Sequence, residues 1–479
     1  MLPTRPAPEI ARANPLHAPL DVPSDRLALR IGSWPEPALL ESGAGFGVSG
    51  RWSFLTARPR LVFEATGTSW RLRTPSGTVE TGAGDGLIEF ARLLREFRLA
   101  DPTEEPDASM PLFQGGLVGF FGYDLAPRLE RLPRKAGRDS RLPDLRFALY
   151  DTVACIDQET GEATLWAYDL LGEGPLATAR RLRRWHKALL DPVARVPRSE
   201  EIGRLESNFT KREYLDAVRV ALEYIAAGDV FQVNLSQRFE ARGRPVPLDL
   251  YLRLKDRSPA PFGAFLAWDD LAVVSASPEW FYQTSGERIV TRPIKGTRPR
   301  GVDPADDARL AAELRASAKD RAELTMIVDL ERNDLGRVCQ YGTVRVTSPM
   351  EVETFAQVHH LVATVEGGLR LERGPIDVVR ALFPGGSITG APKIRAMQII
   401  DELEPTRRSL YTGAIGYFSQ GGTSAFNIAI RTLLVEGDRV SYQVGGGIVA
   451  DSEPEAEYAE TLHKGRGLRE ALSSGGREP

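Results

Sequence analysis

Thr291-Arg-Pro-Ile-Lys-Gly-Thr-Arg-Pro-Arg-Gly301 places one lysine, Lys295, among three arginines. By residue type alone the stretch is an ordinary surface turn. Against that reading, only eight of the 61 basic residues in the chain are lysines. A lysine at this position therefore suggests a chemical role that arginine cannot fill. Lysine can lose its proton near neutral pH and act as a nucleophile, whereas arginine stays charged. We therefore expect a reactive amine here, its pKa lowered by burial and by the field of Arg292, Arg298 and Arg300.

The segments around this stretch alternate between strand and helix patterns. Thr210 and Glu213 form a capping box, and the apolar residues that recur up to Ile225 predict a helix after it. Periodicity predicts strands at 230–239, 271–275 and 288–292, and helices at 309–330, 376–382, 392–403 and 454–472. Residues 209–472 therefore read as a mixed α and β domain that carries the chemistry.

The first part of the chain has a different pattern. Short strands are predicted at 60–65, 69–74, 117–121, 147–156 and 163–168, each bounded by turn residues. A polar stretch interrupted by proline follows near residues 190–209. We predict an N-terminal portion at 1–195, a linker at 196–208, a catalytic domain at 209–472 and a C-terminal tail at 473–479.

Composition excludes several classes of protein. The chain has 479 residues, of which 42% are hydrophobic and 26% charged, and its net charge of -4 offers no basic footprint for nucleic acid or an anionic membrane. No uncharged apolar run is long enough to span a bilayer, and the N-terminus has no signal-peptide pattern. The two cysteines, Cys155 and Cys339, form no disulfide framework or zinc motif. We expect a cytoplasmic protein without nucleic-acid or membrane partners.

Carboxylates on two predicted helices suggest a metal site. Glu323 lies in a largely apolar neighbourhood, and Glu457 and Glu460 are spaced i, i+3 on a helix that we expect Ser452 and Glu455 to cap. Carboxylates from two helices suit Mg²⁺, which binds a few protein oxygens together with substrate oxygens. The alternative is a solvated acidic face.

Two glycine-rich stretches could bind anions. Gly385-Gly386 and Gly445-Gly446-Gly447 both expose backbone N–H groups, which bind carboxylates. Tight β turns are the commoner explanation for such stretches.

Taken together, these segments resemble the chorismate-utilising enzymes over residues 209–472 almost continuously. The resemblance implies an α+β fold, an αββα sandwich in which helices wrap two antiparallel sheets and both portions of the chain contribute. Leu39-Leu-Glu-Ser42 resembles a segment of the N-terminal portion of such enzymes, which makes Glu41 and Ser42 a possible tryptophan site.

The resemblance also assigns roles to individual residues. Lys295 matches the family's nucleophile, Glu279 its general acid, and His360 a histidine beside the leaving hydroxyl group. A Mg²⁺ ion would be held by Glu323 and Glu460, with Glu457 nearby. The residues expected to bind chorismate are Thr291, Tyr411, Arg431, Gly445, Gly446, Gly447 and Lys464.

Two positions distinguish the branches of this family. Relatives that add water to chorismate have a lysine that acts as a base where this chain has Gln232. Relatives that form anthranilate have alanine at the position of Lys295, and those that form 4-amino-4-deoxychorismate have lysine. Asn234 also resembles the latter group. The resemblance thus implies 4-amino-4-deoxychorismate as the product, with anthranilate formation or a catalytically silent regulatory protein as alternatives.

The ammonia for this reaction must come from elsewhere. Neither Cys155 nor Cys339 lies in a glycine-flanked nucleophile motif of the kind that a glutaminase needs. The resemblance therefore implies a separate glutamine amidotransferase subunit as partner.

Overall fold

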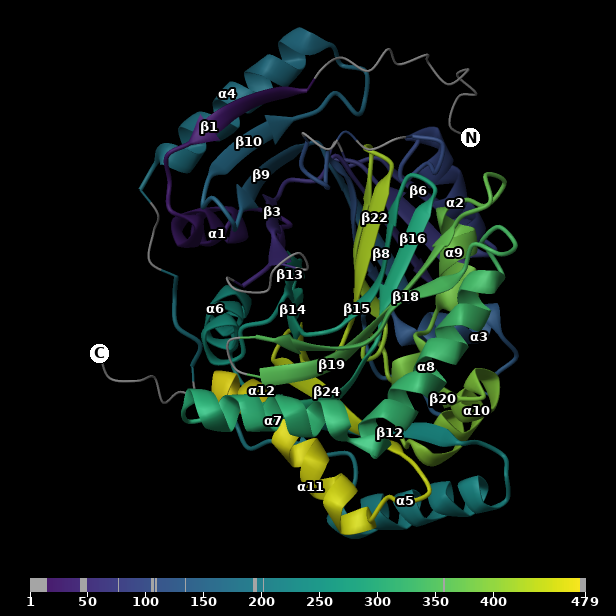
Figure 1. Ribbon diagram of the computed structural model, residues 1–479. Helices are drawn as coiled ribbons and strands as arrows, with labels where there is room; N and C mark the ends of the chain where they lie inside the picture. The colour runs from purple at the N-terminus through teal and green to yellow at the C-terminus, as the bar shows by residue number, and fades with distance from the viewer. Residues whose placement is uncertain are drawn as a thin grey trace.

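Two large antiparallel sheets form the centre of the molecule (Figure 1). The computed structural model describes residues 15–43, 50–75, 77–104, 107, 110–133, 135–192, 196–200, 202–355 and 358–473. The predicted C-terminal tail therefore lies outside the described residues apart from Ser473.

The first sheet draws strands from both ends of the chain. In spatial order it contains β1 (Leu16–Leu20), β10 (Ala163–Ala167), β9 (Thr152–Asp157), β3 (Trp52–Thr56), β2 (Ala38–Glu41), β13 (Phe262–Trp268), β14 (Leu271–Ser277), β23 (Thr432–Glu436), β24 (Arg439–Ile448), β12 (Gln232–Arg242) and β11 (Glu206–Ser207). The short β20 (Gly390–Ala391) pairs with β12 off this path.

The second sheet is equally mixed. Its order is β17 (Ile294–Pro299), β19 (Val358–Gly368), β16 (Arg288–Arg292), β15 (Trp280–Ser285), β22 (Thr423–Ile428), β21 (Ala414–Ser419), β7 (Gly116–Phe121), β8 (Leu145–Tyr150), β4 (Leu61–Thr66), β5 (Ser69–Arg73) and β6 (Val79–Ala83). The remaining strand, β18 (Arg345–Thr354), pairs with β19.

Helices cover the outer faces of both sheets. Those over the first sheet are α1 (Ser24–Gly32), α4 (Pro175–Leu190), α6 (Pro247–Arg257) and α12 (Arg466–Leu472), with α5 (Lys211–Ala226), α10 (Lys393–Leu403) and α11 (Pro454–Lys464) against its β12 and β24 end. Those on the second sheet include α2 (Gly86–Glu96), α7 (Pro304–Ala316), α8 (Ala318–Gly336) and α9 (Pro375–Leu382). Further short helical segments among the described residues are α3 (Ala126–Leu129) and the 3₁₀ turns Tyr123–Leu125 and Gly386–Ile388.

Apolar side chains fill the space between the sheets. Phe54 and Trp268 from the first sheet belong to one buried cluster with Phe120 and Tyr417 from the second. Alternate residues of each strand thus face this inner core, and the opposite faces pack under the helices. The predicted αββα sandwich is confirmed.

The predicted boundary at 196–208 does not separate two cores. Strand β2 pairs with β13, and β7 pairs with β21, so each sheet joins the N-terminal portion to the catalytic domain. The N-terminal portion and the catalytic domain are thus consecutive in the sequence but share one hydrophobic core.

Three predicted elements are interrupted. The run 147–156 is two strands separated at Asp151, the helix 309–330 is α7 and α8 separated at Ser317, and the helix 454–472 is α11 and α12 separated at Gly465. Ser317 accepts a hydrogen bond from the backbone N–H of Asp320 and so caps α8 as a new helix.

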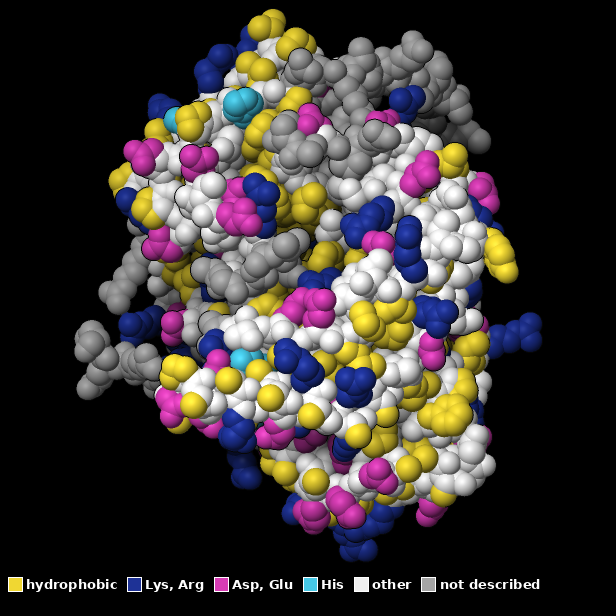
Figure 2. Space-filling model, viewed as in Figure 1, with side chains coloured by type: hydrophobic (Ala, Val, Ile, Leu, Met, Phe, Trp, Pro, Cys, Tyr) yellow, Lys and Arg dark blue, Asp and Glu magenta, His cyan; other side chains and the backbone are white. Residues whose placement is uncertain are grey.

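Charges of both signs are mixed across the molecular face in Figure 2, as the small net charge leads one to expect. No helix among the described residues is long and apolar enough to cross a membrane.

Candidate active site

Lys295 lies on β17, at a point where the strand departs from regular pairing. It pairs with Leu361 of β19, and the register shifts before Thr297. Gly296 takes a φ of 77°, and a Cβ there would lie 2.8 Å from the Leu314 and Asp320 side chains. Only glycine lets the strand bulge so close to α7 and α8.

The amine of Lys295 is largely buried beside a carboxylate. Its side chain is 15% exposed, and Nζ lies 3.7 Å from Glu323 Oε2. Burial lowers the pKa of Lys295 and the nearby Lys464 lowers it further, whereas Glu323 and Glu279 oppose the shift. The Lys295 amine is therefore more readily deprotonated than the amine of a lysine on the surface.

The prediction that nearby arginines depress the pKa of Lys295 is wrong. Arg298 pairs with Asp320 at 3.2 Å, and Arg300 pairs with Asp307 at 2.7 Å. Arg292 is likewise paired with a glutamate of β18. These carboxylates neutralise the arginine charges, and the cation that acts on the amine is Lys464.

Glu279 lies in the turn between β14 and β15 and is buried. Its Oε1 accepts a hydrogen bond of 2.6 Å from the hydroxyl of Ser387, in the 3₁₀ turn Gly386–Ile388. Burial raises the pKa of Glu279, while Ser387, Lys295 and Lys464 lower it. A carboxyl group with a raised pKa beside an amine with a lowered pKa is suited to donate a proton while the amine attacks.

The two carboxylates of α11 both lie close to a glycine of β24. A Cβ on Gly446 would lie 3.0 Å from Glu457 Oε2 and 3.6 Å from Glu460 Oε1. Burial and the neighbouring Glu460 raise the pKa of Glu457. The Ser452 hydroxyl donates to Glu457 Oε1 at 2.6 Å. The predicted capping box is therefore wrong, because Glu453 is the N-cap residue and Ser452 turns to the buried carboxylate.

Glu323, Glu457 and Glu460 are the carboxylates that a Mg²⁺ ion could use here, and its binding stays a prediction. Glu460 and Glu323 both act on the charge of Lys295, so the carboxylates of α8 and α11 face the same site. No group of three or more His, Cys, Asp or Glu side chains in the described part of the chain is arranged to hold a metal ion by itself. Mg²⁺ is commonly held by one or two carboxylates plus substrate oxygens, which agrees with this arrangement.

The glycines Gly445 to Gly447 lie in the interior of β24 rather than in a tight turn, opposite Ser236, Leu235 and Asn234 of β12. Lys464 donates to the carbonyl of Gly445 at 3.0 Å and pairs with Glu460 at 2.6 Å. This places a cation at the end of the glycine stretch.

Tyr411 is buried and Arg431 is partly buried near the same site. Arg431 forms no ion pair within the described residues, and burial lowers its pKa while Glu279 opposes that shift. Burial raises the pKa of Tyr411 to about 12, so its hydroxyl stays protonated as a hydrogen-bond donor. An unpaired guanidinium and a tyrosine hydroxyl together can bind a carboxylate.

His360 is a neutral imidazole. Burial, and next the charge of Arg431, lower its pKa to about 4. Its Nδ1 lies 2.9 Å from the hydroxyl of Thr297. His360 therefore acts near neutral pH through hydrogen bonds.

Thr291 has a different partner from the one expected. Its hydroxyl donates to Glu331 Oε2 at 2.5 Å, and the threonine is buried. Its role in substrate binding stays a prediction.

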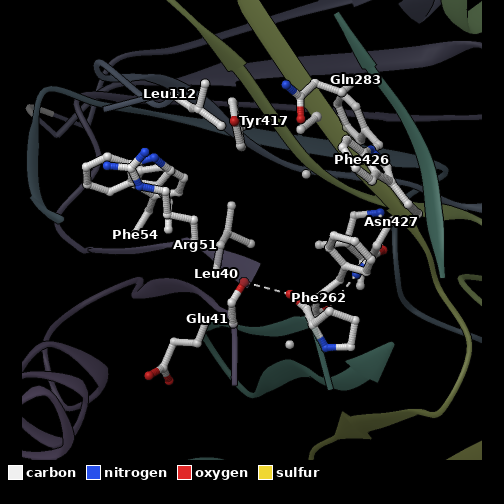
Figure 3. Close-up of a pocket in the computed structure, with 18 residues that line it drawn as sticks. Leu40, Glu41, Arg51, Phe54, Leu112, Phe262, Gln283, Tyr417, Phe426 and Asn427 are labelled. Atoms are coloured by element: carbon white, nitrogen blue, oxygen red, sulfur yellow. Dashed lines mark hydrogen bonds between the residues drawn. The ribbon is translucent and has the colours of Figure 1, made fainter. Parts of the chain in front are cut away.

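Glu41 and Ser42 border a separate cavity lined by aromatic residues (Figure 3). Glu41 points away from the labelled aromatic side chains, pairs with Lys255 at 2.6 Å and accepts from the Tyr251 hydroxyl at 2.6 Å. The Ser42 hydroxyl donates to the carbonyl of Pro261 at 2.7 Å. The carboxylate of Glu41 is thus already satisfied outside the cavity, and tryptophan binding stays a prediction.

Sequence reasoning missed three polar residues of this site: Ser387, Thr297 and Glu331. Each forms a hydrogen bond with a functional side chain that is distant in the sequence. Ser387 bonds to Glu279, Thr297 to His360, and Glu331 to Thr291. Ser387 lies two residues after the singled-out Gly385, and this proximity is the one signal that could have found it.

The site brings a largely buried amine together with a guanidinium and a tyrosine hydroxyl that can bind a carboxylate. Residues 58–470 match the family model described as chorismate binding enzyme. The chain is 43% identical over 444 residues to aminodeoxychorismate synthase component 1 of Klebsiella aerogenes, covering 93% of this chain and 95% of that protein.

It is also 43% identical to anthranilate synthase component 1 of Thermus thermophilus, covering 80% of this chain and 82% of that protein. The crystal structure of anthranilate synthase component I from Streptococcus pneumoniae superposes with a TM-score of 0.75 at 30% identity, covering 87% of this chain and 92% of that one. The chain belongs to the chorismate binding enzyme family.

Proposed function

We propose that this protein converts chorismate and ammonia to 4-amino-4-deoxychorismate, the activity of an aminodeoxychorismate synthase component 1. The observation that carries the proposal is the buried amine of Lys295, 3.7 Å from Glu323 and within the field of Glu279. Three relatives that carry the name aminodeoxychorismate synthase component 1 align over more than nine-tenths of the chain and a fourth over 81%, which supports this choice within the family.

The reaction proceeds in two displacements. The neutral amine of Lys295 adds to C2 of the chorismate ring, the ring double bond shifts, and the 4-hydroxyl group leaves as water with a proton from Glu279. Ammonia then attacks C4, the double bond shifts back, and the amine of Lys295 leaves. The proton that the attacking ammonia loses balances the one that the departing amine needs.

Different groups of residues would bind the two substrate carboxylates. Arg431, Tyr411 and the backbone of the glycine stretch in β24 would hold the enolpyruvyl carboxylate. Glu323 and Glu460, with Glu457 nearby, would hold Mg²⁺, which supplies positive charge for the ring carboxylate. Lys464 contacts both the glycine stretch and Glu460, and after burial it is the charge that lowers the pKa of Lys295.

The identity of Gln232 supports ammonia as the nucleophile. The side chain is fully buried, and neither its oxygen nor its nitrogen has a hydrogen-bond partner in the described part of the chain. An amide at this position cannot take a proton from water, because it is not a base at neutral pH. Water addition, the reaction of relatives with a lysine here, is therefore disfavoured.

We infer that the ammonia comes from a separate glutamine amidotransferase subunit. Cys155 and Cys339 are both buried, and burial raises the pKa of the Cys339 thiol to about 11. Burial also raises the pKa of the Cys155 thiol. A glutaminase nucleophile needs an accessible thiolate, which neither residue supplies.

The second candidate is anthranilate synthesis, which several relatives of comparable identity favour. Incubation with chorismate, Mg²⁺ and ammonium, with and without added aminodeoxychorismate lyase, separates the two. We expect p-aminobenzoate only when the lyase is present. Anthranilate formed without the lyase would refute the proposal.

The role of the lysine is tested separately. Lys295→Ala should still bind chorismate but lose 4-amino-4-deoxychorismate formation, and Lys295→Arg should be equally inactive because arginine stays charged. Turnover by Lys295→Arg at the wild-type rate would exclude the covalent step.

A further inference from the structure

A buried ion pair joins the end of α10 to the segment that precedes β21. The side chains of Arg408 and Glu404 are 1% and 2% exposed. Arg408 Nε lies 2.9 Å from Glu404 Oε2, and Nη2 lies 2.7 Å from Oε1. The same Oε1 accepts from the backbone N–H and the hydroxyl of Ser236, at 2.9 and 2.6 Å. Charges this deeply buried require such hydrogen bonds, because they have lost their contact with water.

The remaining N–H groups of Arg408 hold three other residues. Nη1 donates to the carbonyl of Ile388 at 3.1 Å and to the hydroxyl of Thr412 at 3.2 Å. Nη2 donates to the carbonyl of Asn234 at 2.7 Å. Together with the two bonds to Glu404, these contacts use all five N–H donors of an arginine side chain. Arg408 therefore has no donor left for a ligand.

Two of these acceptors belong to segments that form the active site. Ile388 follows Ser387, the residue whose hydroxyl holds the general acid. Asn234 of β12 lies opposite Gly447 of the glycine stretch in β24. The side-chain amide of Asn234 also donates to the Ile388 carbonyl, at 2.9 Å. Arg408 thus fixes β12 and the 3₁₀ turn in one arrangement.

The third acceptor, Thr412, follows Tyr411 in a turn that begins at Arg408. The backbone N–H of Tyr411 donates to the Arg408 carbonyl at 2.9 Å, and the guanidinium carbon lies 5.5 Å from the centre of the Tyr411 ring. Ser409 and Thr412 have φ angles of 53° and 61°, which are unfavourable for residues with a side chain. The surrounding structure must hold such a turn, and the hydrogen bond from Nη1 to Thr412 contributes to this.

We propose that Arg408 is a positioning residue for chorismate, which acts through Tyr411. It fixes the turn 408–412 so that the Tyr411 hydroxyl meets the enolpyruvyl carboxylate, and it does not contact the substrate itself. The inference rests on the proposed function, because chorismate and the role of Tyr411 belong to that proposal. The charge of Arg408 also opposes the effect of burial on the pKa of Tyr411, which makes the hydroxyl a stronger hydrogen-bond donor.

The test is a double-mutant cycle on the Kd for chorismate. Calorimetry with Mg²⁺ on protein that carries Lys295→Ala measures binding without turnover. Arg408→Lys keeps a cation for Glu404 but lacks the fork that holds the three other acceptors. We expect Arg408→Lys to raise Kd about tenfold, as the loss of a hydrogen bond to a charged group does. In protein that also carries Tyr411→Phe, it should change Kd by less than about twofold, because the hydroxyl it positions is missing.

Arg146 of β8 offers a matched control. Its side chain is 3% exposed and pairs with Glu64 at 3.0 Å, and its guanidinium carbon lies 4.2 Å from the centre of the Trp268 ring. It therefore has the same kind of buried ion pair and aromatic contact as Arg408, with partners outside the active site. Arg146→Lys should lower the stability in urea titrations and leave the Kd for chorismate unchanged.

A milder variant keeps the inference testable if Arg408→Lys does not fold. Thr412→Val removes one acceptor of Arg408 and leaves the pair with Glu404 in place, and we expect it to raise Kd about threefold. A wild-type Kd in either variant, or the same increase with and without the Tyr411 hydroxyl, overturns the proposal.

Two further outcomes separate the possible causes. An equal loss of affinity in Arg146→Lys would show that lowered stability alone weakens binding, and it would also overturn the proposal. If the wild-type enzyme forms no 4-amino-4-deoxychorismate but the coupling between Arg408 and Tyr411 is present, the proposed function is refuted and the positioning role of Arg408 stands.

Discussion

The hydrogen bond between Ser387 and Glu279 makes a prediction about the strength of the general acid. The serine hydroxyl donates to Glu279 Oε1 at 2.6 Å and therefore stabilises the carboxylate form. A hydrogen bond to a charged group contributes about 1.5–3 kcal/mol, and one pKa unit corresponds to about 1.4 kcal/mol. Ser387→Ala should therefore raise the pKa of Glu279 by about one to two units.

The consequence for activity has a definite sign. Glu279 must be protonated to act, so its activity is lost as pH rises through its pKa, and Ser387→Ala moves that alkaline limb upward. The plateau rate should fall, because an acid with a higher pKa donates its proton less readily. The assay is the initial rate of 4-amino-4-deoxychorismate formation across pH, and Ser387→Thr, which keeps the hydroxyl, is the control. An unchanged or lowered limb in Ser387→Ala would show that the hydrogen bond does not tune the acid.

Two further predictions concern the same site, and a third concerns a buried ion pair. Glu279→Gln should lower kcat by about 10²–10⁴-fold with little change in the KM for chorismate, as steady-state kinetics would detect, because the amide cannot donate the proton. Gly446→Ala should raise the Mg²⁺ concentration for half-maximal activity by about 10–100-fold, because its methyl group would lie 3.0 Å from Glu457 Oε2; an unchanged Mg²⁺ requirement would exclude these carboxylates as the metal site. Arg408→Met should lower the free energy of unfolding by about 3–5 kcal/mol in urea titrations, because it leaves the buried Glu404 without its cation; a stability equal to wild type would contradict that reading.

Local signals in the sequence predicted the fold well where one segment decides its own structure. The capping box of Thr210 and Glu213 begins α5 as expected, because both groups lie within one turn. The break between α7 and α8 was missed, since Ser317 reads as an ordinary polar position inside a helical pattern. At the break Ser317 caps α8, and Gly296 lies close to Leu314 of one helix and Asp320 of the other, a tertiary contact without a local signature.

The candidate site was predicted to the extent that residue type implies chemistry. Lys295 was recognisable because lysine is rare in this chain, and the structure surrounds it with Glu323, Glu279 and Lys464 as a reactive amine requires. Ser387 and Glu331 were not recognisable, because a serine or a helical glutamate is common at any surface. Their significance arises only when distant segments are brought together.

The sharing of both sheets between the two ends of the chain also determines when this enzyme can first work. Strand β2 cannot pair until β13 has been synthesised, and β7 cannot pair until β21 has been synthesised. In the same way β12 needs β24, which carries the glycine stretch. During synthesis the early strands leave the ribosome with unpaired edges, which are sites of misassembly until their partners arrive. Pairings this distant in sequence also slow folding, because long loops must close first. The active site thus forms only when the whole chain has folded, and we expect a prematurely terminated chain to be inactive.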